Sequence, residues 1–326
     1  MVPNQIPSQQ RKNRHARSRK KSKKPRRNRQ QQTLEQPKPR QRKPQHRPSA
    51  RAPGFCGFSH DLHGLCRLEY KFMASGTQIE LWPAEKVAAQ ATVSQASNGI
   101  HYAAWGETRV PDSELEHLVG AVPAALSAAL AHRAYYFVPL AIADTGEIMI
   151  APGYSVDLGD RAICHRNAIF GSTEAVFLST RLVEDRFGLA FEFFINVAHN
   201  FVEAAGVPES FSSLAWSQAE AQVRGETSQD AWESRRRAQD VRNPESKTAQ
   251  IPIDERARGS FFESAFSDAL AIYMLSLAVD FDYHDLRERD YPLLAAPALA
   301  ERLRHVASLF PANQGYDFQV LYRRKG

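Results

Sequence analysis

Two residues one helical turn apart, His199 and Glu203, are spaced so that both could bind one metal ion. They lie in residues 191–206, where apolar side chains recur every three or four positions and predict an amphipathic helix. Residues four apart project from the same side of a helix, and imidazole and carboxylate are both zinc ligands. The alternative is that these two residues, with Glu192 and Asn196, form a solvated helix face whose border with the core lies at His199.

A second group of metal-binding residue types consists of Cys56, His60, His63 and Cys66. Thiolate and imidazole together suit tetrahedral zinc. Their spacing matches no standard zinc finger or knuckle, and a loop this short would have to fold almost entirely around the ion. An ordinary loop with partly buried cysteines is the alternative, and the sequence leaves both open.

The basic residues of the chain are concentrated at its start. Residues 1–51 hold 18 of the 42 Lys and Arg but one of the 36 Asp and Glu, so a segment of charge +17 precedes a remainder of charge −11. Large apolar residues are almost absent from this segment, so it cannot repay the entropy of ordering, and we expect a disordered arm over residues 1–52. The densest part of the arm contains Arg11, Lys12, Arg14, Arg17, Arg19, Lys20, Lys21, Lys23, Lys24, Arg26, Arg27 and Arg29.

This charge density predicts that the arm binds nucleic acid or another polyanion. No Phe, Trp or Tyr interleaves the basic residues, so base stacking is not offered, and binding should be independent of sequence and sensitive to salt. Two alternatives stay open. Residues 20–29 could be a basic targeting segment, and the arm could be a solubilising tail that touches the acidic remainder of the chain.

Composition narrows the class of protein. With 43% hydrophobic residues, the chain can bury a sizeable core. No run of about 18 apolar residues predicts a transmembrane helix, and the start has no apolar stretch of the kind found in signal peptides. We therefore expect a soluble intracellular protein without a membrane partner, cytoplasmic or, if eukaryotic, nuclear, with its three cysteines reduced.

Turn residues, capping residues and apolar periodicity predict the other elements. In chain order they are a strand near 100–105, a helix over 111–131, a hairpin of the runs 134–142 and 147–151, a buried edge strand at 175–178, a helix from 180 to Gly188, an exposed or mobile charged segment at 233–247, an apolar helix over 260–280, a last helix over 292–310, and a closing strand at 316–322.

The order of elements across residues 168–206 resembles the core of the bacterial neutral zinc metallopeptidases, a zincin family. A short strand precedes a helix ending in Arg186-Phe187-Gly188, and the long helix with its histidine follows. That family carries HExxH on the long helix and a third zinc ligand on a later helix, with a pattern like E-x-x-A-D-x-x-A. Residues 263–271 resemble this pattern, with one more residue between the Glu and the Asp, and the resemblance extends over residues 168–279.

The chain departs from the family motif at two positions. In such enzymes both histidines bind zinc, and the Glu between them polarises the zinc-bound water. Here Asn200 stands at the general-base position, where its amide cannot accept a proton near neutral pH, and Glu203 replaces the second histidine. The resemblance therefore implies zinc as the cofactor, held by His199, Glu203 and Glu263, and water activation without its usual base.

The preferred hypothesis is a single α+β domain over residues 53–326. It would have a zincin-like core at about 135–290, a small mixed or antiparallel sheet and several helices. Its degenerate site would be catalytically inactive, so the domain would act as a binding or structural body for a peptide or protein, while the arm contacts the polyanion.

Two other hypotheses use the same residues differently. One is an active zinc metallopeptidase with an altered HNxxE site, in which Glu192 or Asp268 replaces the missing base. The other is a nucleic-acid-binding or capsid-type structural protein, since basic arms ahead of compact domains hold packaged genomes. The sequence leaves three states of the site open: retained proteolysis, a metal held without hydrolysis, and no metal at all.

Overall fold

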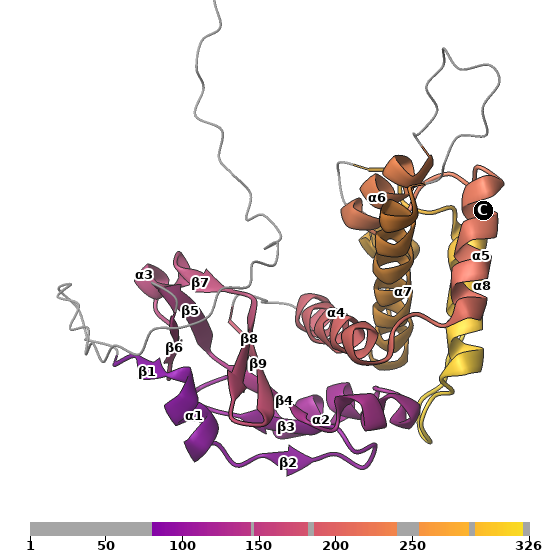
Figure 1. The fold of residues 1–326 in the computed structure, drawn as a ribbon. Helices are drawn as coiled ribbons and strands as arrows, with labels where there is room; N and C mark the ends of the chain where they lie inside the picture. Colours follow the sequence, from indigo (N-terminus) through magenta and orange to yellow (C-terminus); the bar gives the residue numbers. More distant parts are fainter. Residues whose placement is uncertain (1–79, 145–146, 182–185, 240–253, 287–290, 322–326) are drawn as a thin grey trace, which may run out of the picture. The chain divides into compact units, whose positions relative to one another are not determined.

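The computed structural model describes residues 80–144, 147–181, 186–239, 254–286 and 291–321 (Figure 1). All of them belong to the second of two units into which the chain divides, Tyr70–Gly326. The predicted boundary between an arm at 1–52 and a domain at 53–326 lies outside the described residues and stays a prediction, as does the order of the arm.

The larger sheet has five strands and mixed directions. Its parallel strands β3, β4 and β9 are flanked by the antiparallel strands β2 and β8. In the order in which they lie in the sheet, the strands are β2 (Ser94–Gln95), β3 (His101–Ala104), β4 (Arg133–Val138), β9 (Thr173–Ser179) and β8 (His165–Phe170). Every residue of β4 is buried, because both faces of the sheet are covered. The mixed sheet and the helices confirm the predicted α+β class.

A smaller antiparallel sheet continues from the same chain. Its strands, in sheet order, are β1 (Trp82–Pro83), β6 (Glu147–Ala151), β5 (Leu140–Asp144) and β7 (Ala162–Ile163). Asp144 pairs with Glu147, which confirms the predicted hairpin. The apolar run 134–142 is not one strand, however. It divides at Pro139 into β4 of the large sheet and β5 of the small one, because proline has no N–H for a ladder hydrogen bond.

Helices make up most of the second half of the chain. The helical elements, 3-10 turns included, are α1 (Ala84–Gln90), α2 (Asp112–Gly120), η1 (Ala124–Leu130), α3 (Val156–Gly159), α4 (Arg186–Ala205), α5 (Glu209–Glu220), α6 (Gln229–Gln239), α7 (Glu255–Ala278), η2 (Tyr283–Leu286) and α8 (Ala296–Leu309). The helix predicted over 111–131 is interrupted before η1, since Pro123 cannot continue α2.

Helix α4 lies between the large sheet and α7 (Figure 1). Phe193 on one side packs edge-on against Tyr135 of β4, with ring centroids 5.2 Å apart. Phe201 meets Phe266 of α7 at 6.3 Å. Aromatic rings on two sides of the helix fix its rotation about its own axis, and this rotation decides which polar residues can reach solvent.

Three predicted elements differ from the structure. Gly188 does not end a helix, because Arg186, Phe187 and Gly188 form the first residues of α4 itself. The strand at 175–178 is part of β9, which lies inside the sheet, and the edge strands are β2 and β8. Residues 316–321 form no strand. Instead, the Tyr316 hydroxyl donates to the backbone carbonyl of His117, and the two rings stack with centroids 5.3 Å apart.

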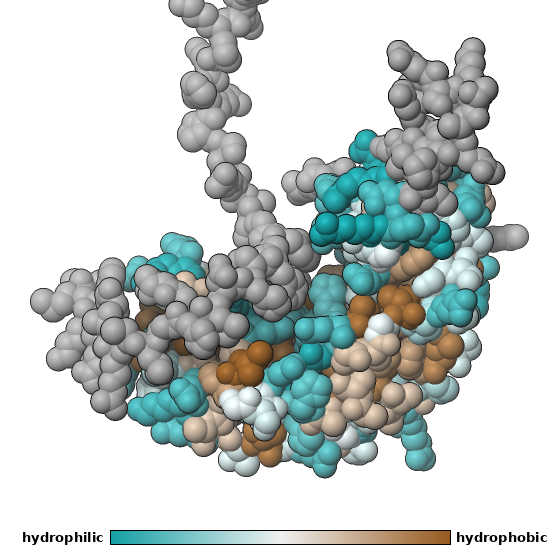
Figure 2. Space-filling view, viewed as in Figure 1, coloured by the Kyte–Doolittle hydropathy of each residue, from teal (hydrophilic) through white to brown (hydrophobic). Residues whose placement is uncertain are grey.

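Helices α5 to α8 close around a buried ion-pair network. Glu226, fully buried before α6, accepts from Arg235 at 2.9 Å and from Arg302 of α8 at 2.8 Å. Part of the predicted exposed segment 233–247 is therefore buried, since Arg235 points into this network. The outer face of α6 keeps the expected character, and hydrophilic side chains gather over it in Figure 2.

Helix α7 is long and apolar enough to cross a membrane by length and composition. In the described part of the chain it is the one helix that meets this test, and 72% of its apolar window is buried inside the protein. Such burial is typical of a core helix in a soluble protein.

Candidate functional site

The three predicted zinc ligands are not brought together. His199 and Glu203 are exposed on α4, and Glu263 is exposed near the start of α7. Among the residues that the structure describes, no group of three His, Cys, Asp or Glu side chains could hold a metal ion. The donor set predicted from the sequence therefore does not fit zinc, and no chemical step can be derived through it.

Glu203 is instead a partner of Arg133, the first residue of β4. Arg133 Nη2 donates to Glu203 Oε2 at 2.7 Å, and the same guanidinium bonds Glu174 of β9 and the backbone carbonyl of Asn200. The Arg133 side chain is only 4% exposed. A buried guanidinium needs acceptors for its donors, so the carboxylate at the second-histidine position serves this arginine.

Asn200, at the general-base position, faces the core. It is 3% exposed, and its Nδ2 donates to the Tyr135 hydroxyl at 3.4 Å. Burial raises the pKa of Tyr135 to about 12, so this hydroxyl keeps its proton at neutral pH. The amide is thus part of a buried polar contact between α4 and β4 and is not presented to a ligand.

His199 has a different set of neighbours from those predicted. Its side chain reaches solvent, but enough protein surrounds it that loss of hydration lowers its pKa, and electrostatic interaction with His165 of β8 lowers it further. Asp230 of α6 and Glu192 act in the opposite direction. His165 Nδ1 lies 2.5 Å from Glu192 Oε1, and Asn196 donates to the Glu192 backbone carbonyl at 2.8 Å.

The polar residues predicted to share one face of α4, Glu192, Asn196, His199 and Glu203, therefore have different partners. Glu192 bonds His165, and Asn196 bonds Glu192. Asn196 is also buried, whereas the alternative of a solvated helix face predicts that it is exposed. His165, Asp230 and Arg133 were not found by sequence reasoning. They lie far from α4 in the chain, on β8, α6 and β4, and no local pattern pairs them with it.

Asp268 of α7 is a buried carboxylate whose pKa is changed by its surroundings. It accepts from the Thr227 hydroxyl at 2.8 Å, and burial raises its pKa from 3.8 to about 7. Nearby Glu226 raises the pKa further, while Arg302 and hydrogen bonds from Ser228 and Thr227 lower it. This carboxylate lies within the helical core and not at a surface where it could act on a peptide.

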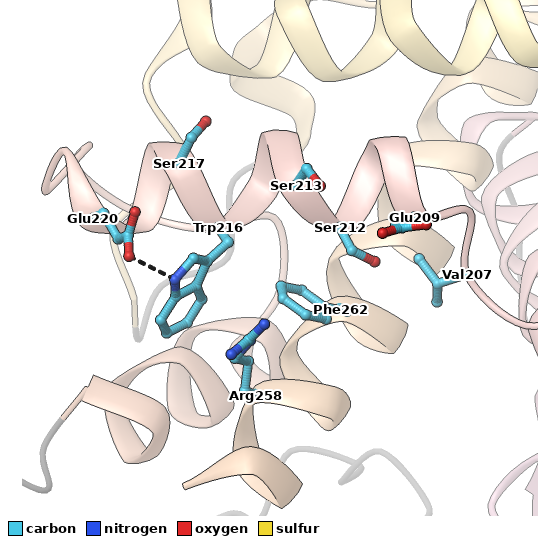
Figure 3. A pocket seen from close by; sticks show the side chains of 9 residues that line it. All are labelled: Val207, Glu209, Ser212, Ser213, Trp216, Ser217, Glu220, Arg258 and Phe262. Atoms are coloured by element: carbon cyan, nitrogen blue, oxygen red, sulfur yellow. Dashed lines mark hydrogen bonds between the residues drawn. The ribbon is translucent and has the colours of Figure 1, made fainter. Parts of the chain in front are cut away.

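A cavity of about 530 Å³ opens between α5 and the first turns of α7 (Figure 3). Trp216 donates its indole N–H to Glu220 at 2.8 Å, and the Arg258 guanidinium lies 5.1 Å from the Trp216 ring centroid. The lining residues are Val207, Glu209, Ser212, Ser213, Trp216, Ser217, Glu220, Arg258 and Phe262. The cavity includes none of the three predicted zinc ligands.

Two groups of predicted site residues lie outside the described residues. They are the basic residues between 11 and 29 and the group Cys56, His60, His63 and Cys66. For both groups the function remains a prediction.

Comparisons with known proteins found no match. No family model, no curated protein and no solved structure matches this chain.

Proposed function

We propose that this protein is a metallopeptidase-like body with a degenerate, catalytically inactive site. The observation that carries the proposal is the use of the two altered motif positions for packing. Asn200 bonds Tyr135, and Glu203 bonds the buried Arg133. Both contacts tie α4 to β4, so these positions now stabilise the fold where the resembled enzymes perform chemistry.

The arrangement of elements supports the resemblance behind this proposal. A mixed sheet with an antiparallel edge strand lies on one side of α4, and the later apolar helix α7 lies on the other. Because the predicted donor set does not fit a metal, the proposal includes no metal and no hydrolysis. Binding of a peptide or protein by the body is the activity that remains.

An assay of casein and peptide cleavage tests the inactive site. We expect no cleavage that depends on His199, so His199→Ala and a chelator should both leave any background rate unchanged. His284→Ala, which replaces an exposed histidine on η2, is the matched control. Cleavage abolished both by His199→Ala and by the chelator, but not by the control substitution, would refute the proposal.

We further propose that the arm binds nucleic acid or another polyanion. Its net charge of +17 over residues 1–51 supports this, because neutralising phosphates releases condensed counterions. Removal of residues 1–51 should abolish binding of nonspecific RNA or DNA at low salt, as measured by fluorescence anisotropy. Unchanged affinity after the deletion would show that the arm is not the binding segment.

A further inference from the structure

A pair of arginines lies at the carboxyl ends of the parallel strands, away from the site on α4. Arg181 follows β9, and Arg109 lies in the loop that follows β3. In the described part of the chain, neither guanidinium has a carboxylate within ion-pair distance. In open parallel sheets of α/β proteins, ligands bind beyond the carboxyl ends of the strands, and the three parallel strands of this mixed sheet present the same kind of edge.

The loop that carries Arg109 is held rigidly by the strand ends. Trp105 N–H donates to the Phe137 carbonyl at 3.0 Å, and Glu107 N–H donates to the Pro152 carbonyl at 2.8 Å. At Gly106 the backbone φ is 75°, and an added Cβ would lie 2.7 Å from the Pro152 oxygen. Only glycine fits there, so the close approach of this loop to Pro152 depends on this residue.

Arg181 is fixed against the same loop. Its Nε donates to the Thr108 carbonyl at 3.2 Å, and its Nη2 donates to the Glu107 carbonyl. The Thr180 hydroxyl bonds the Thr108 carbonyl as well, at 3.0 Å. Two of the donors of Arg181 are thus used to orient the side chain, and the remaining guanidinium N–H groups are left for a ligand.

Arg109 adopts a backbone conformation that its residue type disfavours. Its φ is 59°, in the left-handed region, although it is neither glycine nor asparagine. The side chain is exposed and makes no hydrogen bond or ion pair among the described residues. A strained backbone that holds an arginine beside another arginine costs stability twice, through the backbone and through like-charge repulsion. The positive neighbour indeed contributes, after loss of hydration, to a lowered pKa of Arg181.

We propose that Arg109 and Arg181 form a binding site for a phosphate group on the folded body. The Arg181 guanidinium is bonded to the carbonyl of Thr108, the residue before Arg109, so the two arginines are neighbours at this loop. Two neighbouring guanidinium groups suit the oxygens of a phosphate, and their mutual repulsion would be relieved when it binds. Among the described residues, Glu107 is the acid whose charge raises the pKa of Arg181, so it opposes the effect of Arg109 and should weaken the site. The phosphate could come from a nucleic-acid backbone or from a free phosphate compound, and the same oxygens would be recognised in either case.

The test measures phosphate binding by the full-length chain and its variants. Inorganic phosphate and tripolyphosphate are titrated by calorimetry, and a labelled single-stranded oligonucleotide by fluorescence anisotropy. Arg109→Gln should weaken phosphate binding about fivefold, and Glu107→Gln should strengthen it. Arg166→Gln removes the same charge from an exposed position on β8 and should change nothing. Because every variant keeps the arm, the arm contributes equally to all of them.

Arg109→Gly separates binding from folding. Glycine adopts the positive φ without strain, so this variant should keep or raise the melting temperature while weakening phosphate binding as much as Arg109→Gln does. Weakened binding of the oligonucleotide as well as of the two inorganic ligands would identify a backbone phosphate as the source, and the salt dependence of oligonucleotide binding should then be less steep by about 1. Weakening confined to the inorganic ligands would identify a free phosphate compound. If Arg109→Gln and Arg166→Gln bind all three ligands equally well, the site does not exist. That result would be independent of the arm deletion, which tests the arm alone.

Discussion

Burial of the Asp268 carboxylate makes the free energy of unfolding depend on pH. The network around it supplies hydrogen bonds from Thr227 and Ser228, yet burial still raises its pKa to about 7. The folded protein therefore holds a proton that the unfolded chain has released above its pKa of about 3.9. Since this group binds more protons in the folded state between these two values, its contribution to the free energy of unfolding falls as the pH rises from about 4 to about 7.

Replacement of Asp268 by asparagine should remove this pH dependence. We expect the wild-type protein to lose about 2 kcal/mol of unfolding free energy from this group between pH 5.5 and pH 8, and the Asp268→Asn variant to lose none of it. Asparagine keeps an oxygen that accepts from Thr227. Urea unfolding at both pH values measures the difference, and Asp157→Asn, at an exposed acid, is the control. An equal pH dependence in wild type and Asp268→Asn would contradict the assignment.

Arg133 and Glu203 should contribute unequally to stability although they bond each other. Arg133→Met removes the partner of one Glu174 oxygen and removes a donor from the Asn200 carbonyl inside the core, so it should cost about 3 kcal/mol. The Glu203 side chain is 68% exposed, and Glu203→Gln should cost less than about 1 kcal/mol. Denaturant unfolding measures both, with Arg166→Met as an exposed control. Similar costs for the two substitutions would show that the ion pair itself, and not the burial of Arg133, carries the energy.

At the scale of the element, the rotation of α4 about its own axis, between the sheet and α7, decides which of its polar residues are buried. Phe193 and Phe201 hold this rotation, and it turns Asn200 toward Tyr135. His199, one residue earlier and about 100° around the helix, is left at the surface. A substitution at position 200 therefore changes the packing of the core and does not contact a ligand bound at His199.

Asn200→Glu, which restores the acidic residue of the resembled motif, should not create a peptidase. It places a carboxylate beside Tyr135 in the core and should cost about 2–4 kcal/mol of unfolding free energy. Asn167→Glu introduces the same residue at an exposed position of β8 and should be nearly neutral. Thermal unfolding and a casein assay check both parts. Stable folding together with new cleavage would show that position 200 faces a working site.

At the scale of the whole chain, charge is the dominant feature. A segment of +17 precedes a remainder of −11, so a polyanion should be attracted to the first and repelled by most of the second. The arginine pair at Arg109 and Arg181 would be a local exception on the folded body. Binding should accordingly depend on salt in proportion to the number of arm charges that meet phosphates.

Neutralising two parts of the arm should change the salt dependence by different amounts. Residues 11–29 hold 12 Lys and Arg, and residues 38–51 hold six. The slope of log affinity against log salt is negative, and substituting either set by glutamine should make it less steep. The change should be about twice as large for the first set as for the second. Anisotropy with a single-stranded oligonucleotide between 50 and roughly 200 mM salt measures the slopes. Equal slopes in both variants and the wild type would rule out the arm as the polyanion-binding segment.

The sequence by itself determined what depends on local periodicity and on composition. It predicted the charge division, the hairpin at β5 and β6, and the apolar helices α4, α7 and α8, because side chains repeat with the period of their element. The polar spacing of His199 and Glu203 correctly placed both on one helix. It did not determine their partners, because a partner on another element leaves no local pattern.

Only the tertiary structure decided what the polar residues do. Arg133 precedes Glu203 by 70 residues, and His165 precedes Glu192 by 27, so each pair meets only after the sheet has formed against α4. The burial of Asn200 likewise follows from aromatic packing on two sides of the helix. Spacing on a helix fixes which residues share a side, but the surrounding core decides which side faces solvent, and with it which residues can bind a ligand.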